Sequence, residues 1–154
     1  MCDVIRCVFF DYPVAHLLIR KHYDYFNQRR FAEGADLFSE DCVLEHPPFG
    51  QTRRGRDGYL ELVNLWIQAF PDSQLQVDHV EQRGDTICEV DLIGTGTHRG
   101  DFDMGGYGVF KATGVEATLR FRELLEIRGG QITYSSLTFN VHDLIRQLAA
   151  KGDV

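Results

Sequence analysis

The chain has 154 residues, of which 44% are hydrophobic and 25% are charged, and its net charge is −7. The length fits one domain with a hydrophobic core, and the composition is that of ordinary globular proteins, which excludes disordered and fibrous classes. The negative charge argues against nucleic acid as a partner, because proteins that bind phosphate backbones need clustered Lys and Arg.

Basic residues gather at two places, Arg29-Arg30 and Arg53-Arg54-Gly55-Arg56, and we interpret both as solvated loop charge. The longest apolar run near the N-terminus, Val8 to Phe10, is too short for a signal peptide or a membrane span. The cysteines are scattered without a CxxC pair, which favours free thiols over disulfides or a metal site. We therefore expect a cytoplasmic protein with no membrane partner and no metal.

Residues 1–13 contain strand-like residues that Pro13 separates from the rest, so we expect an N-terminal arm followed by one domain over residues 14–150. From Val14 onward, apolar spacing of three and four residues predicts an amphipathic helix, whose stripe consists of Ala15, Leu17, Leu18, His22, Tyr25 and Phe26. A shorter helix is predicted over residues 32–38.

A short strand is predicted over residues 42–46, where Pro47-Pro48 ends it because proline cannot donate to a ladder. Residues 57–70 then carry apolar side chains at helical spacing, Trp66 and Phe70 among them, and this third helix is expected to stop at Pro71.

After Pro71 the hydrophobic period changes to two. Residues 73–83 and 86–98 flank Gly84-Asp85, and residues 115–127 and 132–139 flank Gly129-Gly130, which predicts two antiparallel hairpins with two-residue turns. Helices followed by a meander of strands are typical of an α+β fold in which the helices cover one face of the sheet.

Turn positions fix which side chains share a face, because side chains alternate along a strand. In the second hairpin Leu125 should lie opposite Tyr134, and Glu123 opposite Ser136. The inward face would then carry Leu119, Phe121, Glu123, Leu125, Ile127, Ile132, Tyr134, Ser136, Thr138 and Asn140.

In the first hairpin, the same alternation turns His79 inward together with Leu75, Val77, Cys88, Val90 and Leu92, and turns Asp78, Glu89 and Asp91 outward. His98 also points inward if no bulge occurs at Gly94 or Gly96. Polar groups meeting among apolar side chains have two explanations: a structural hydrogen-bond network, or a ligand site in which burial tunes an acid or a histidine for proton transfer.

Five segments occur in an order that resembles the SnoaL-like polyketide cyclases of the nuclear-transport-factor-2-like superfamily, over roughly residues 14–150. They are residues 66–72 (WIQAFPD), 84–85 (GD), 96–102 (GTHRGDF), 129–132 (GGQI) and 146–148 (RQL). The resemblance implies a cone of three N-terminal helices on a strongly curved, mainly antiparallel sheet that encloses a pocket, with a short C-terminal helix. It also implies cofactor-free chemistry on a hydrophobic small molecule, and dimers or tetramers.

One position departs from the family. The cyclases typically end the last strand with an acid–base aspartate, and counting back from Arg146 places Asn140 there. Asparagine cannot exchange a proton near neutral pH, although it can hydrogen-bond a carbonyl or enolate oxygen. Asn140 is equally typical of a helix N-cap, with Asp143 three positions on. Ser136 stands where the family often has tryptophan.

We therefore hypothesise a cyclase or isomerase of secondary metabolism that acts on a polyketide-like or terpenoid molecule by general acid–base catalysis. Glu123 with His79 or His98 would move the proton, while Asn140 with Tyr134 would hold the developing oxyanion. The expected substrate contacts are Tyr134, Ser136, His46 at the pocket mouth, Trp66, Phe70 and Phe121. The alternatives are a non-catalytic binding module, or a hydrolase or dehydratase, which would need a second inward carboxylate.

Overall fold

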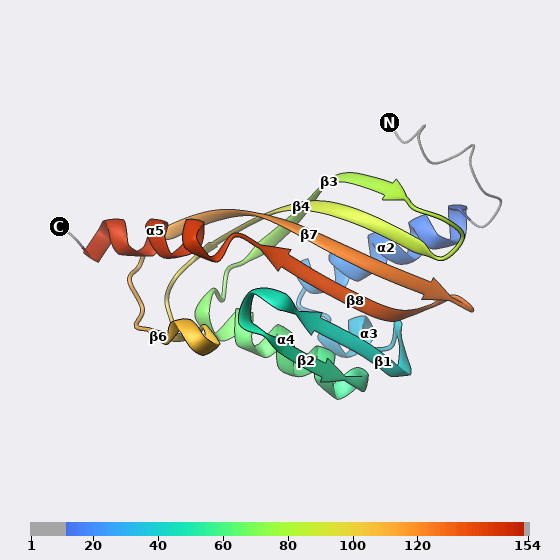
Figure 1. The fold of residues 1–154 in the computed structure, drawn as a ribbon, viewed down its shortest axis with the longest axis horizontal. Coiled ribbons are helices and arrows are strands. Elements are labelled where there is room, and N and C mark those ends of the chain that lie inside the picture. Colours follow the sequence, from blue (N-terminus) through green and yellow to red (C-terminus); the bar gives the residue numbers. More distant parts are fainter. Residues whose placement is uncertain (1–11, 153–154) are drawn as a thin grey trace.

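The structure is a computed structural model that describes residues 12–152 (Figure 1). The first helix, α2 (Tyr12–Asn27), begins before Pro13, because proline is tolerated in the first turn of a helix. The rest of the predicted arm, residues 1–11, lies outside the described residues.

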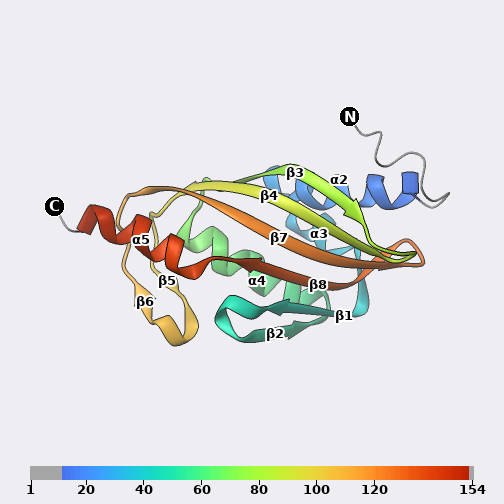
Figure 2. The ribbon, with the colours of Figure 1, turned by 45° about the horizontal axis from the view of Figure 1, so that its top comes forward.

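Helices α2, α3 (Phe31–Ala35) and α4 (Gly55–Ala69) pack on one face of a sheet, and α5 (Val141–Gly152) follows the last strand (Figures 1 and 2). The buried stripe of α2 contains Ile19 and Tyr23 beside the predicted Leu18 and His22, whereas Leu17 is 48% exposed. None of the helices among the described residues is long and apolar enough to cross a membrane.

The second helix is shorter than predicted. It ends at Ala35, and Phe38 is the first residue of a strand rather than the last of a helix. Phe38 pairs in parallel with Ile132 and is fully buried, so tertiary packing overrides the local helical spacing.

Six strands form a mixed, mainly antiparallel sheet in the order β2-β1-β8-β7-β4-β3, in which only β1 and β8 run parallel. The strands are β1 (Phe38–His46), β2 (Gln51–Arg54), β3 (Gln74–Gln82), β4 (Ile87–Thr97), β7 (Glu116–Arg128) and β8 (Gln131–Phe139). A small hairpin, β5 (Phe102–Asp103) and β6 (Val109–Phe110), lies apart from it, with the 3-10 turns η1 (Pro47–Phe49) and η2 (Gly105–Tyr107) nearby.

The predicted turn between β7 and β8 is confirmed. Gly129 and Gly130 have φ values of 58° and 77°, the left-handed backbone of a two-residue hairpin turn. The connection between β3 and β4 is longer than predicted: β3 ends at Gln82 and β4 begins at Ile87, so residues 83–86 form the loop.

Each of the two hairpins contains one bulge, and each bulge reverses the predicted alternation beyond it. In the second hairpin the register shifts at Thr133, so that Leu125 pairs with Ser135 and Glu123 with Leu137. In the first hairpin it shifts at Asp78: Val77 still pairs with Leu92, but Val80 now pairs with Val90.

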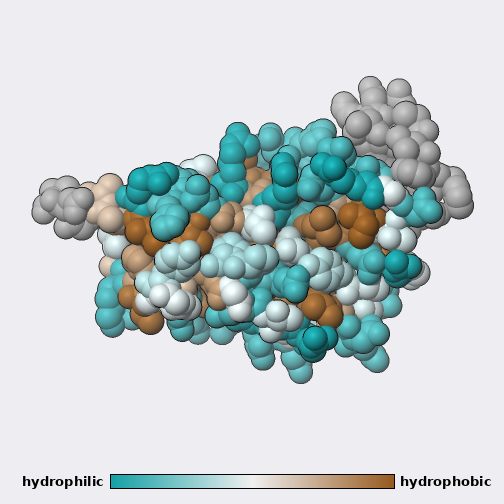
Figure 3. All heavy atoms as spheres, viewed as in Figure 1, coloured by the Kyte–Doolittle hydropathy of each residue, from teal (hydrophilic) through white to brown (hydrophobic). Residues whose placement is uncertain are grey.

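The outer face of the sheet, which faces the viewer in Figure 3, is mostly hydrophilic with small separate apolar patches. Ion pairs cross its strands, including Arg122 to Asp91 at 2.9 Å and Arg120 to Asp78 at 3.4 Å. Glu89 pairs with Arg83 at 2.8 Å, so the outward orientation predicted for Asp78, Glu89 and Asp91 is confirmed.

Candidate functional site

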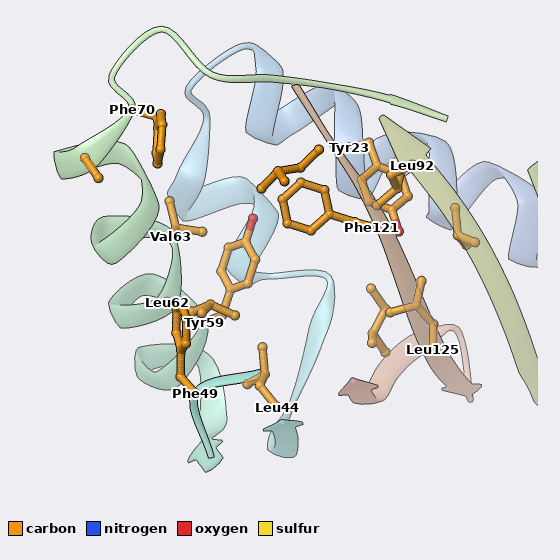
Figure 4. Packing of buried hydrophobic residues seen from close by; sticks show 14 of the residues in the cluster. Tyr23, Leu44, Phe49, Tyr59, Leu62, Val63, Phe70, Leu92, Phe121 and Leu125 are labelled. Carbon is orange, nitrogen blue, oxygen red and sulfur yellow. The ribbon is translucent and has the colours of Figure 1, made fainter. Parts of the chain in front are cut away.

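A cavity of about 100 Å³ lies between the helices and the inner face of the sheet, which is space for several water molecules or a small organic molecule. Most of its lining is apolar, and the exposed lining residues Gln74 and Thr95 mark its open side. Figure 4 shows Tyr23, Leu92 and Phe121 facing Tyr59 and Val63 of α4. The lining includes the three aromatic residues predicted to contact substrate: Trp66, Phe70 and Phe121.

Glu123 lies in the wall of this cavity, and its inward orientation is as predicted. The side chain is buried and accepts hydrogen bonds from three side chains. On Oε1 it receives the His22 Nε2–H, at 3.0 Å, and the Tyr23 hydroxyl, at 2.7 Å; on Oε2 it receives the Ser135 hydroxyl. The partners of the carboxylate are therefore on α2 and β8, and none of them is His79, His98 or Asn140.

This network determines which groups carry charge and protons. Burial alone would raise the pKa of Glu123, but the His22 charge and the hydrogen bonds from His22, Ser135 and Tyr23 outweigh it, and the pKa is lowered. Burial and the Glu123 charge raise the pKa of Tyr23, which stays a phenol and a donor. Because Glu123 is a carboxylate, His22 Nε2 carries its proton toward it.

Several buried polar atoms of the cavity lining have no hydrogen-bond partner among the described residues: His22 Nδ1, the Tyr59 hydroxyl, Trp66 Nε1 and the Ser73 hydroxyl. Burial raises the pKa of Tyr59, so its hydroxyl remains a donor. A buried polar group left unpaired costs about 1–3 kcal/mol, so the cavity offers hydrogen bonds that a bound molecule or water would use. Among the described residues, no group of three or more His, Cys, Asp and Glu side chains is placed to hold a metal ion.

His46 was predicted to lie at the mouth of the pocket. That position is wrong, because the residue is only 1% exposed. Its ring packs against Phe49, Trp66 and Phe139 at centroid distances of 4.7, 5.8 and 5.9 Å. It projects from the same face of β1 as the cavity residue Leu44, two positions away, but is not itself part of the lining. Burial, with a smaller contribution from the Arg53 charge, lowers the pKa of His46 to about 4, so the imidazole is neutral at physiological pH.

The inward orientation predicted for His79 is wrong. Its side chain is 53% exposed, and its nearest acidic partner is Glu81, at 4.0 Å. The bulge at Asp78 is the physical reason, since it sends Val80 instead of His79 to the inner face.

His98 is fully buried, yet it does not reach Glu123. It follows the end of β4, where Nδ1 lies 3.0 Å from the Thr113 hydroxyl and accepts the Thr113 backbone N–H at 3.2 Å. Its ring packs against Phe70 at 5.3 Å and is not part of the cavity lining. The structure therefore gives His98 a role in fixing the segment around Thr113.

Tyr134 and Ser136 point to the outer face, contrary to prediction, because the bulge at Thr133 exchanges them with Ser135 and Leu137. The Tyr134 hydroxyl donates to the Glu45 carboxylate on that outer face. Neither side chain reaches the cavity.

Asn140 is exposed and caps α5, where its Oδ1 accepts the Asp143 backbone N–H at 3.1 Å. This hydrogen bond confirms the capping interpretation, and Asn140 is not part of the cavity lining. Replacing Asn140 by Ala should lower the free energy of unfolding by about 1 kcal/mol in urea titrations, while Asn140→Asp should restore it. Ligand affinity should not change in either variant, and a loss of affinity would show that this position does reach the cavity.

Sequence reasoning missed four residues that the structure brings to the cavity or to Glu123: His22, Tyr23, Tyr59 and Ser135. His22 alone carried a signal, since a histidine in the apolar stripe of a predicted helix must be buried. Ser135 was missed because the unpredicted bulge at Thr133 turns it to the inner face. Nothing in the sequence pattern distinguishes Tyr59 from an aromatic residue of the core.

Residues 16–148 match the family model of the SnoaL-like polyketide cyclases. No curated protein sequence matches the chain significantly. A candidate SnoaL-like polyketide cyclase from Jannaschia sp. CCS1 superposes with a TM-score of 0.78 at 14% identity, covering 90% of this chain and 93% of that one.

Two further structures show the same fold. IdmH, a candidate polyketide cyclase from Streptomyces antibioticus, has a TM-score of 0.73 at 22% identity and covers 87% of this chain and 97% of its own. A Catenulispora acidiphila protein with a ketosteroid isomerase-like fold, in complex with trimethylamine, has a TM-score of 0.71 at 13% identity over 86% of this chain and 92% of that one.

Proposed function

The chain belongs to the SnoaL-like polyketide cyclase family, and on that premise we propose that it is a cofactor-independent enzyme that cyclises or isomerises a polyketide-like or terpenoid molecule by general acid–base catalysis. The observation that carries this proposal is the buried Glu123 carboxylate, which holds His22 at 3.0 Å in the wall of an apolar cavity. A carboxylate that orients a histidine is a recurrent arrangement for moving protons in enzymes.

His22 is the proposed base. In the neutral imidazole, Glu123 holds the Nε2–H and the lone pair is on Nδ1, which has no hydrogen-bond partner among residues 12–152. His22 would remove a proton from a carbon next to a carbonyl, and the adjacent carboxylate would stabilise the imidazolium that forms. Because the pKa of Glu123 is lowered, the carboxylate orients and stabilises and does not itself keep the proton.

Tyr59 is the proposed oxyanion donor. Its buried hydroxyl is protonated and without a partner in the described part of the chain, so it can donate to the oxygen on which negative charge develops. Trp66, Phe70 and Phe121 would exclude water and hold an apolar substrate. These residues replace Asn140 and Tyr134 in the hypothesis, because those two side chains lie outside the cavity.

Proton abstraction can be tested without the natural substrate. β-Tetralone is a bicyclic ketone with acidic α-protons, whose exchange in D₂O is followed by NMR. The wild-type protein should accelerate the exchange, and His22→Gln should slow the catalysed rate by more than about 100-fold, because glutamine cannot accept the proton. Glu123→Gln should also slow it strongly, since the histidine loses its orienting charge.

The exposed His79 supplies the matched control, because His79→Gln removes an imidazole without touching the cavity. Its exchange rate should equal that of the wild type. Equal rates for His22→Gln and the wild type would eliminate His22 as the base.

A non-catalytic binding module is the second candidate. The observation that favours it is that the family's aspartate position is Asn140, whose side chain caps a helix outside the cavity. Thermal stabilisation by β-tetralone without accelerated exchange would support the module over the enzyme. A hydrolase or dehydratase would need a second carboxylate in the cavity, and the structure does not favour it. Among the described residues, Glu123 is the only acidic residue of the lining, and Asp78, Glu89 and Asp91 face outward.

A cytoplasmic location and assembly into dimers or tetramers are further parts of the proposal, and they rest on the sequence and the family resemblance. Light scattering on the purified protein measures the assembly directly.

A further inference from the structure

We propose that His46 and Trp66 form a second hydrogen-bonding subsite, which holds a hydroxyl or carbonyl oxygen of the bound molecule away from the His22–Glu123 pair. The inference rests on the proposed function, in that it requires the cavity to bind a substrate. It adds a second anchoring point that the acid–base chemistry does not need.

The first support is unused hydrogen-bonding capacity. Both ring nitrogens of His46 and the Trp66 Nε1 are buried without a partner among the described residues. The two rings are in edge-to-face contact, with centroids 5.8 Å apart. Buried polar groups are almost always hydrogen-bonded in native proteins, so three such atoms in two touching side chains point to an occupant with polar atoms.

The second support is the chemistry of the imidazole. Burial keeps His46 neutral, so one ring nitrogen donates and the other accepts. An uncharged subsite that offers donors from both side chains and one acceptor suits a hydroxyl, which can use both kinds, or a carbonyl oxygen. It suits a neutral oxygen better than a carboxylate or an ammonium, because the ring packs against the aromatic side chains of Phe49, Trp66 and Phe139.

The third support is position along α4. His22 lies beside Tyr59, with ring centroids 6.1 Å apart, whereas His46 lies beside Trp66. Tyr59 and Trp66 are two helical turns apart, or about 10 Å. The two polar centres are therefore spaced to hold opposite ends of a flat bicyclic molecule, with the aromatic side chains between them.

His46 lies behind Trp66, which itself lines the cavity. A ligand oxygen in the cavity would therefore meet Trp66 first, and it would reach His46 only after a shift of the Trp66 ring. Binding should then select the shifted ring position, which makes the subsite detectable only with a ligand long enough to reach it.

Two probes separate the subsite from the rest of the cavity: a naphthol, with one hydroxyl, and a dihydroxynaphthalene whose hydroxyls lie at opposite ends. The wild-type protein should bind the dihydroxynaphthalene about three- to tenfold more tightly in calorimetric titrations, the gain of one buried hydrogen bond. His46→Phe should abolish this preference and leave naphthol affinity unchanged. Equal affinity of the wild-type protein for both probes would overturn the subsite.

A readout on the wild-type protein covers the case in which His46→Phe fails to fold. With ¹⁵N-labelled histidine, the dihydroxynaphthalene should shift the ring nitrogen signals of His46, and the naphthol should not. Signals that stay unchanged with both probes would show that His46 is a core residue or is satisfied by a fixed water.

Failure of the proposed function has a different signature. If naphthol affinity does not respond to Glu123→Gln or His22→Gln, the acid–base end of the cavity does not hold the hydroxyl. A dihydroxynaphthalene preference that is lost in His46→Phe would still establish the second subsite in that case.

Discussion

Replacing Glu123 by alanine is expected to lower the free energy of unfolding by about 3–5 kcal/mol, the usual cost of removing one partner from a buried charged network. Glu123 is 6% exposed, and its carboxylate accepts three hydrogen bonds. Without it, the His22 Nε2–H and the hydroxyls of Tyr23 and Ser135 remain buried with no acceptor, and each unpaired group carries its own desolvation penalty. Urea unfolding monitored by circular dichroism at neutral pH measures the change.

Two variants calibrate this result. Glu116→Ala changes an exposed glutamate of the same strand and should stay within about 0.5 kcal/mol of the wild type. Glu123→Gln keeps the volume and one acceptor oxygen, so its loss should be smaller than that of Glu123→Ala. A Glu123→Ala protein as stable as Glu116→Ala would mean that the carboxylate is solvated and that the network does not form.

The same network shows how far the sequence could lead. Strand β7 alternates without interruption from Ala117 to Leu125, so the inward orientation of Glu123 could be predicted from period-two patterning alone. The hydrogen-bond partner of Glu123 on β8 could not be predicted, because it depends on the bulge at Thr133, which adds one residue to that strand. A single bulge exchanges every later side chain between the two faces, and nothing in the local sequence QITYSSLTF marks where it occurs.

The first hairpin shows the same limit. A bulge at Asp78 moved the predicted catalytic candidate His79 to the solvent, while Cys88, Val90 and Leu92 on the unbroken partner strand kept their predicted orientation. The prediction of the fold was less sensitive to such an error than the prediction of the site. Helix and strand patterns sum over many residues, so one misplaced residue leaves the architecture intact, whereas a site of three side chains changes completely.

The hydrogen-bond partners of Glu123 on distant elements could not be predicted from the sequence pattern for another reason. His22 is 101 residues from Glu123 in the chain, and its place opposite β7 depends on how α2 packs across the sheet. The apolar stripe of α2 predicts that His22 is buried but not what it meets there. Only the packing of helix on sheet joins a histidine, two hydroxyls and a carboxylate into one network.

The stability of the protein is expected to fall by about 3 kcal/mol between pH 6.5 and pH 4 because of His46 alone. Its pKa is about 4 in the folded protein and 6.5 in the unfolded chain, and each pKa unit corresponds to about 1.4 kcal/mol. In this interval the unfolded chain binds a proton at His46 and the folded protein does not, so stability rises with pH up to about 6.5. Below pH 4 both states bind the proton, and the contribution is lost.

Comparison with His46→Phe isolates this contribution, because Glu123 and the other acids titrate in both proteins. Urea unfolding at a series of pH values should give two stability curves that run parallel above pH 6.5. Between pH 6.5 and pH 4 the wild-type curve should fall more steeply, by about 3 kcal/mol in total, because phenylalanine binds no proton in either state. His79→Phe removes an exposed imidazole and should leave the slope of the wild type unchanged. Parallel curves for His46→Phe and the wild type throughout would show that the His46 ring can be protonated without unfolding, which a dry, unpartnered imidazole among Phe49, Trp66 and Phe139 does not allow.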